Sequence, residues 1–78
     1  MAVEDVVKQI FKEVLDVSPD EIKPNDPLEQ GLGVDSTEMV EISVGIKKRL
    51  NIKIDDNELK KTHSFNDIVG LLKQKGVN

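Results

Sequence analysis

The chain has 78 residues, no cysteine, two phenylalanines as its only aromatic residues and a formal net charge of −4. This length supports one domain with a modest core, so we expect a single domain over residues 1–78. The missing cysteines exclude disulfides, thiolate metal sites and a thiol nucleophile from the polypeptide, and the few aromatic rings argue against a base-stacking surface for nucleic acid.

Charge is distributed unevenly along the chain. Residues 1–45 carry a net charge of −8 and residues 46–78 carry +4. The two halves therefore present opposite electrostatic fields, and a partner can respond to either. No apolar run is long enough to span a membrane and no segment resembles a signal peptide, so we expect a cytoplasmic protein without membrane insertion. We also expect a monomer.

The first predicted element is an amphipathic helix. Apolar residues within residues 3–15 recur at i, i+3, i+4 and i+7, which is the spacing of one helix face. We expect this helix to end near Asp16, because a serine and a proline follow. Ser18 and Glu21 then have the spacing of a capping box around a short helical turn that begins at Pro19.

Residues 17–35 form the longest irregular stretch. Pro24 and Pro27 exclude a long helix after the turn. Loops of this length inside compact domains are usually functional or disordered. Spaced apolar residues favour order, because they can attach the loop to a core: Ile22, Leu28, Leu32 and Val34.

The second predicted helix begins at Asp35 or Ser36 and ends near Leu50. Its apolar side chains cover a wide arc, so the helix should contact several neighbours. The arc consists of Met39, Val40, Ile42, Val44, Ile46 and Leu50. The opposite, exposed face is expected to hold Glu38, Glu41, Gly45, Lys48 and Arg49.

The rest of the chain predicts a connector, a short helix and a last long helix. "LNIKID" alternates like a strand but has no pairing partner, so we expect an extended connector that buries Ile52 and Ile54. "DDNELKK", residues 55–61, favours a short helix. Ser64 and Asp67 have capping-box spacing at the start of the last helix. The expected fold is therefore all-α: a small bundle of three principal helices plus one short helix, with a long loop between helices one and two.

Ser36 is open to three interpretations. It can be a plain N-cap, since serine and aspartate both favour that position. It can be a hydrolytic nucleophile that uses Asp35 and His63, although it lies in no G-x-S-x-G elbow and nothing nearby suggests an oxyanion hole. It can also be a modification site, because a phosphoester at a helix N-terminus is favoured by about 0.3–1 kcal/mol.

"GVDS", residues 33–36, resembles the attachment motif of acyl carrier proteins. The resemblance continues through the valine-rich first helix, "SPDEI", "LGVDSTEMVEI", "LNIKI" and "SFNDIVGLL". It implies that a phosphopantetheinyl transferase attaches 4′-phosphopantetheine from coenzyme A to Ser36, next to Asp35. The protein would then be no enzyme. It would carry acyl intermediates as thioesters and present them to enzymes of fatty acid or related lipid or polyketide biosynthesis.

The resemblance also implies where partners and cargo bind. Acidic residues after the serine match positions that basic docking patches of partner enzymes recognise in the family. Asp35 is expected to belong, with Ser36, to the cofactor-binding site. The residues expected to act in partner recognition are Asp35, Glu38, Met39, Glu41, Lys48 and Arg49. The residues expected to line an acyl pocket are Val40, Val44, Ile54, Leu59, Ile68 and Leu72.

Several residues depart from the family pattern. Thr37 occupies a position that is usually leucine, and the run from Lys47 to Arg49 stands where carboxylates are usual. These departures indicate a specialised carrier with dedicated partners. A peptidyl, aryl or D-alanyl carrier, or an unmodified helical interaction module, are the alternatives. Three cations on an acidic domain do not indicate a nucleic-acid site, and we expect no dedicated metal site from the loose carboxylates of Asp55, Asp56 and Glu58.

Overall fold

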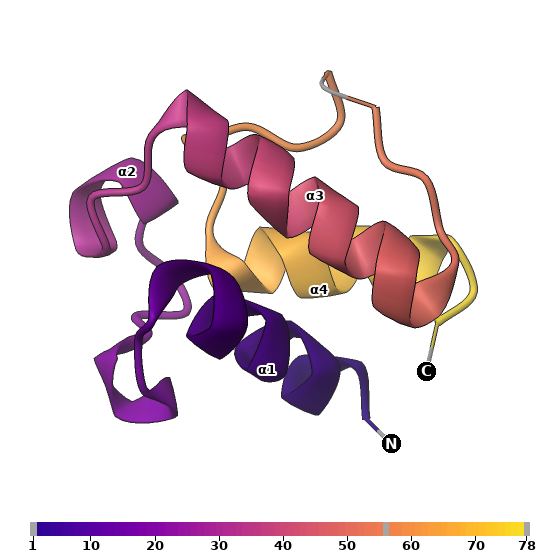
Figure 1. The fold of residues 1–78 in the computed structure, drawn as a ribbon, viewed down its shortest axis with the longest axis horizontal. Coiled ribbons are helices and arrows are strands. Elements are labelled where there is room, and N and C mark those ends of the chain that lie inside the picture. Colours follow the sequence, from indigo (N-terminus) through magenta and orange to yellow (C-terminus); the bar gives the residue numbers. More distant parts are fainter. Residues whose placement is uncertain (1, 56, 78) are drawn as a thin grey trace.

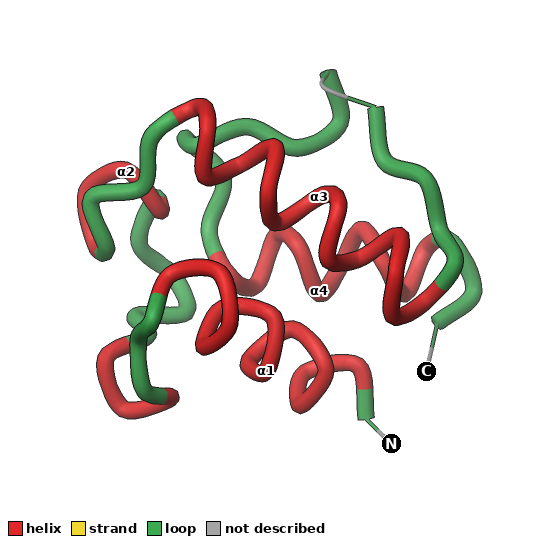
Figure 2. The backbone as a smooth tube through the Cα atoms, in the orientation of Figure 1, coloured by secondary structure: helices red, strands yellow, loops and turns green. Residues whose placement is uncertain are grey.

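A computed structural model describes residues 2–55 and 57–77 of the chain. Its helices follow one another as α1 (Val3–Leu15), the 3₁₀ turn η1 (Pro19–Glu21), α2 (Leu28–Gly31), α3 (Ser36–Leu50) and α4 (Phe65–Gln74). Figure 1 labels the α-helices. Loops connect them, and Figure 2 contains no strand in the described part of the chain. The all-α prediction of three principal helices and a short one is confirmed.

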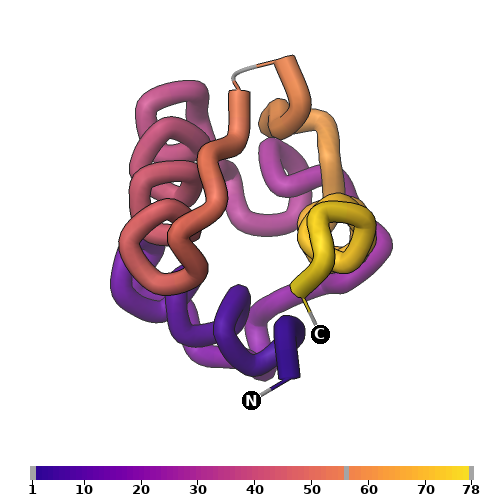
Figure 3. Tube along the Cα trace, turned by 90° about the vertical axis from the view of Figure 1, so that its right-hand side faces the viewer, coloured from indigo at the N-terminus to yellow at the C-terminus, as the bar shows by residue number. Residues whose placement is uncertain are grey.

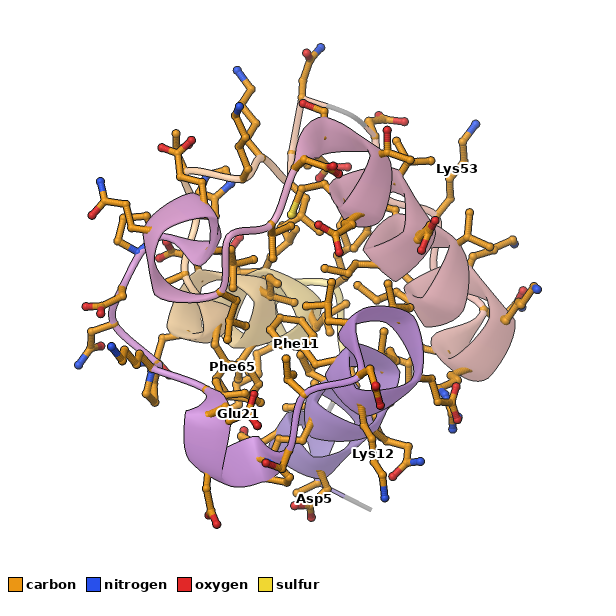
Figure 4. The ribbon with its side chains drawn as sticks, turned by 60° about the vertical axis from the view of Figure 1, so that its left-hand side comes forward. Asp5, Phe11, Lys12, Glu21, Lys53 and Phe65 are labelled. Atoms are coloured by element: carbon orange, nitrogen blue, oxygen red, sulfur yellow. The ribbon has the colours of Figure 1, made fainter. Side chains whose placement is uncertain are left out.

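The core lies between α1, α3 and α4. α1 packs against both other long helices, and Figure 3 shows the connector between α3 and α4 passing above them. Phe11 and Phe65 meet edge to face in the interior, with ring centroids 5.7 Å apart and planes at 82°, while Lys12 and Lys53 point outward (Figure 4). The largest fully buried side chains are Val3, Val7, Ile10, Phe11, Leu28, Ile42, Ile46, Ile68 and Leu72.

The ends of the long helices follow the sequence pattern. Asp16 and Asn51 adopt left-handed conformations directly after α1 and α3, and each donates its backbone N–H to the carbonyl four residues earlier. At the start of α4, Ser64 Oγ accepts the N–H of Asp67 at 3.2 Å, while Ser64 N–H donates to Asp67 Oδ2 at 2.9 Å. The predicted capping box at Ser64 is therefore confirmed.

The short helix lies in a different segment from the one that the sequence pattern favoured. Among the described residues of 55–61 there are only turns and irregular backbone, so the prediction of a helix there is wrong; Asp56 lies outside the described residues. Local polar groups take the backbone bonds instead. Asp55 N–H donates to Glu58 Oε1 and Lys60 N–H donates to His63 Nδ1.

α2 forms inside the long loop, where no helix was expected. The N–H groups of Leu28 and Glu29 donate to the carbonyl oxygens of His63 and Lys61 at 2.9 and 3.0 Å. These acceptors satisfy the first donors of α2, which would otherwise be unpaired. The helix therefore depends on the segment that precedes α4, more than thirty residues away in the chain.

Two further expectations are corrected. Ser18 makes no side-chain bond to the backbone of η1, because its Oγ donates to Glu21 Oε1 at 3.2 Å, so the capping box expected there is absent. Gly45 does not lie on the exposed face of α3. It faces α1, where an added Cβ would lie 3.0 Å from Ile10 Cγ2. The missing side chain lets the two helices approach closely.

Candidate functional site

Asp35, not Ser36, caps α3. Glu38 N–H donates to Asp35 Oδ1 at 2.8 Å, and Asp35 N–H donates to Glu38 Oε1 at 3.1 Å. These reciprocal bonds form a capping box one residue earlier than a cap at Ser36 would require. The interpretation of Ser36 as an N-cap is therefore wrong: Ser36 is the first residue of the helix. Gly33, with φ of +66°, makes the turn that leads into this start.

The Ser36 side chain is exposed, and its hydroxyl does not help to stabilise the described structure. Its Oγ makes no hydrogen bond within residues 2–55 and 57–77, and the backbone N–H groups of Ser36 and Thr37 have no protein acceptor there either. A phosphodiester on Ser36 Oγ would add oxygen acceptors next to these two donors, at the positive end of a helix of 15 residues. The site thus fits a 4′-phosphopantetheine group.

The other groups of a hydrolytic triad are engaged elsewhere. The Asp35 carboxylate accepts from Glu38, and His63 Nδ1 accepts from the backbone of Lys60 at 2.8 Å. No hydrogen bond in the described part of the chain joins Ser36 to either side chain. The described hydrogen bonds therefore do not join a nucleophile, a base and an orienting acid as a triad requires.

A groove begins at Ser36 and lies between α3 and the segment that precedes α4. Its volume is about 390 Å³. The segment opposite α3, orange in Figure 1, runs beside the N-terminal half of that helix. The lining residues are Ser36, Met39, Val40, Ser43, Leu59, Lys60, Lys61 and Thr62.

Two of the six residues expected to line an acyl pocket border this groove. They are Val40, which is 53% exposed, and Leu59, which is 5% exposed. Val44 is 46% exposed on α3 but is not part of the lining. Ile54, Ile68 and Leu72 lie in the closed core, outside the groove lining.

Sequence reasoning did not place the polar lining of the groove. Lys60 and Lys61 belong to the segment that was expected to form a short helix, and their position opposite Ser36 depends instead on the turn before α4. That turn is fixed by backbone bonds to α2, which local sequence patterns do not reveal. Ser43 also lines the groove, and its Oγ donates to the Met39 carbonyl at 3.2 Å.

The residues expected to recognise partners occupy two ends of α3. Asp35 and Glu41 are exposed and Glu38 is half-buried, whereas Met39 is only 5% exposed and belongs mainly to the core. At the other end, Lys48 is exposed and Arg49 forms an ion pair with Glu13 of α1. Of the two cations, Lys48 is thus the one without an ion pair among the described residues.

Residues 2–55 and 57–77 contain no group of three or more potential metal ligands. In the same part of the chain, no helix combines the length and the apolar character needed to cross a bilayer.

Comparison with known proteins agrees with this geometry. Residues 5–72 match the family model described as "Phosphopantetheine attachment site". The chain is 35% identical to an acyl carrier protein of Wolinella succinogenes over 88% of this chain and 91% of the relative. It is 35% identical to one of Campylobacter fetus over 92% and 94%, and 31% identical to one of Nitratidesulfovibrio vulgaris over 96% and 99%. The chain belongs to the acyl carrier protein family.

Proposed function

We propose that this protein carries acyl groups as thioesters on a 4′-phosphopantetheine arm attached to Ser36 Oγ. The observation that supports the proposal most directly is the exposed, unbonded Ser36 at the first position of α3, beside a groove of about 390 Å³. Because Asp35 provides the cap, the helix start does not need the serine hydroxyl. The family consists of carriers, so the chain presents cargo and does not catalyse its conversion.

Attachment needs one phosphoryl transfer from coenzyme A. Ser36 Oγ forms the new bond to phosphorus and gives up its proton to the transferase, while the bond to 3′,5′-adenosine bisphosphate breaks. The chain contributes position and electrostatics. The exposed hydroxyl is accessible to an enzyme, and the helix dipole favours the resulting anion by about 0.3–1 kcal/mol. The arm supplies a terminal thiol, which this cysteine-free chain lacks.

The proposed partners are a phosphopantetheinyl transferase and acyl-transfer or chain-modifying enzymes that dock on α3. Two features support docking there. Asp35 and Glu41 are exposed near Ser36, and Val40 is a large apolar side chain that is 53% exposed on the same helix. Lys48, exposed near the other end of α3, supports the proposal that these partners are dedicated to this carrier. We also propose that it acts as a monomer in the cytoplasm.

The proposal is tested by intact mass after incubation with coenzyme A and a transferase of broad specificity. The wild type should gain one phosphopantetheine and Ser36→Ala should gain none. Ser18→Ala removes another exposed serine and Ser43→Ala removes a serine that lines the groove, so both should be modified as the wild type is. An unmodified wild type, as expected of a plain interaction module, or a modified Ser36→Ala would contradict the proposal.

A further inference from the structure

The groove beside Ser36 has a charge opposite to that of the chain. The chain has 15 acidic and 11 basic residues, yet the groove lining contains two lysines and no carboxylate. The rest of the lining consists of three apolar residues and three hydroxyl residues, given above. An apolar floor beside cations matches a ligand that has a short apolar segment and an anionic end.

The two lysines differ in how they are engaged. Lys61 Nζ lies 3.8 Å from Glu29 Oε2, so part of its charge is balanced by α2. Lys60 has no ion pair among the described residues. Its side chain is exposed, but it belongs to the groove wall. Lys60 is therefore the cation with the greater capacity to pair with an anion in the groove.

The wall that holds both lysines is fixed by hydrogen bonds on either side of them. Lys60 N–H donates to His63 Nδ1 at 2.8 Å, and His63 N–H returns a bond to the Lys60 carbonyl at 2.9 Å. The Lys61 carbonyl accepts the N–H of Glu29 at the start of α2. The backbone thus holds Lys60 at a defined position opposite α3.

We propose that Lys60 selects acyl cargo that ends in a carboxylate or a similar anion, joined to the thioester by a short apolar segment. The proposal rests on the attachment of the arm to Ser36. The apolar segment contacts Met39, Val40 and Leu59, and the anionic end pairs with the Lys60 ammonium at the groove wall. A plain aliphatic chain of the same length gains the apolar contact alone.

The test compares two thioesters of equal carbon count on the same arm, glutaryl and pentanoyl. A transferase loads each from its acyl-coenzyme A, and intact mass verifies the product. Both products carry the same phosphodiester, so a difference between them reports only the terminal group. A ¹³C label on the glutaryl carboxylate gives its titration midpoint by NMR, and thermal unfolding gives the stability of each loaded form.

The wild type should show a lower carboxylate titration midpoint than Lys60→Gln, and a higher melting temperature with glutaryl than with pentanoyl. Both differences should shrink in high salt. Lys53→Gln is the matched control, because Lys53 is an exposed cation of the same connector outside the groove lining. Glu29→Gln releases Lys61 without removing a cation, so it should keep or enlarge the glutaryl effect.

Equal midpoints in the wild type and Lys60→Gln would overturn the proposal, and so would an equal shift in Lys53→Gln. If Lys60→Gln lowers the stability of both loaded forms equally, the lysine stem only covers apolar surface and the proposal is wrong. A chain that takes up no arm at all is detected by mass. That result contradicts the attachment to Ser36 and removes the cargo proposal with it.

Discussion

Asp35 and Glu38 hold the start of α3 through two reciprocal hydrogen bonds, of 2.8 and 3.1 Å, that pass over Ser36 without involving its hydroxyl. Two neighbouring residues thus have separate roles: Asp35 stabilises the helix start, and Ser36 is the proposed attachment point of the arm. The aspartate keeps the helix start ordered, and the serine that follows it is free to be modified. The Ser36 hydroxyl therefore contributes no cap to α3.

Asp35→Ala should lower the free energy of unfolding by about 0.5–2 kcal/mol, because it leaves the Glu38 N–H without its acceptor. Ser36→Ala should change stability much less, since Ser36 Oγ makes no bond in the described structure. Asp35→Asn keeps an N-cap acceptor and is the control that should fall near the wild type. Urea unfolding of the three variants measures this order, and a larger loss in Ser36→Ala than in Asp35→Ala would contradict it.

Two glycines in helices should respond oppositely to alanine. At Gly70, in α4, a Cβ would meet nothing within 4 Å, so Gly70→Ala should raise stability by up to about 1 kcal/mol. At Gly45, a Cβ would lie 3.0 Å from Ile10 Cγ2, and Ile10 is 1% exposed. Gly45→Ala should therefore lower stability despite its better helix propensity.

Shortening Ile10 checks the cause of the Gly45 effect. Ile10→Ala removes Cγ2, the atom nearest to the added Cβ, and alone should cost about 2–5 kcal/mol. If the clash is with Ile10, the cost of Gly45→Ala should be smaller in the Ile10→Ala background, which a double-mutant cycle of unfolding free energies measures. Additive effects would show that crowding by Ile10 is not the reason.

The basic end of α3 should affect docking through Lys48. Lys48→Glu should slow acyl transfer by a dedicated partner at low salt, with a smaller effect at high salt, because the charge is exposed. Arg49→Glu would also break the ion pair with Glu13, so its effect on docking could not be separated from its effect on stability. Lys12→Glu reverses an exposed lysine in the last turn of α1 and is the control. Equal rates for Lys48→Glu and the wild type at low salt would mean that the charge of Lys48 does not contribute to docking.

The elements that were predicted correctly are those whose sequence signals lie within a few residues of one another. The periodic apolar face of α1 and the capping box of Ser64 and Asp67 use residues within a few positions of one another. Both were predicted from the sequence. The bounds of α3 followed for the same reason, although the choice between Asp35 and Ser36 as the cap needed the structure.

The elements that were missed depend on distant residues. α2 begins where carbonyl oxygens of Lys61 and His63 accept its first N–H groups. Residues 55–61 have helix-forming residue types, but the described residues of this range bury little besides Leu59, so packing does not stabilise a helix there. The groove depends on both features, because the non-helical segment that contains Leu59, Lys60 and Lys61 forms the wall opposite α3. Local patterns could identify Ser36 but not the lysines opposite it.

Glu58 should make stability depend on pH in the acid range. Hydrogen bonds from Lys75 and from the Asp55 backbone hold the pKa of Glu58 below its ordinary value of 4.5. A lowered folded pKa stabilises the fold above the ordinary value, and this contribution is lost as pH falls through the folded pKa. Glu58→Gln and Lys75→Gln should both be less stable than the wild type at neutral pH, and the difference should vanish in acid. A difference that persists unchanged below the ordinary pKa would exclude this cause.

Acyl length should show whether cargo enters the groove or extends into solvent. Each methylene that is fully buried contributes about 0.8 kcal/mol, and the open groove offers apolar contact through Met39, Val40 and Leu59. The melting temperature should rise from the arm alone to medium-chain forms, and the methyl NMR signals of Val40 and Leu59 should shift. Val44, exposed outside the groove lining, is the internal control. Shifts that also reach Ile54 would mean that the groove opens into the core, as the sequence led us to expect of a fatty-acyl pocket. Unchanged melting temperatures and signals at every length would place the cargo in solvent and favour a peptidyl-type carrier.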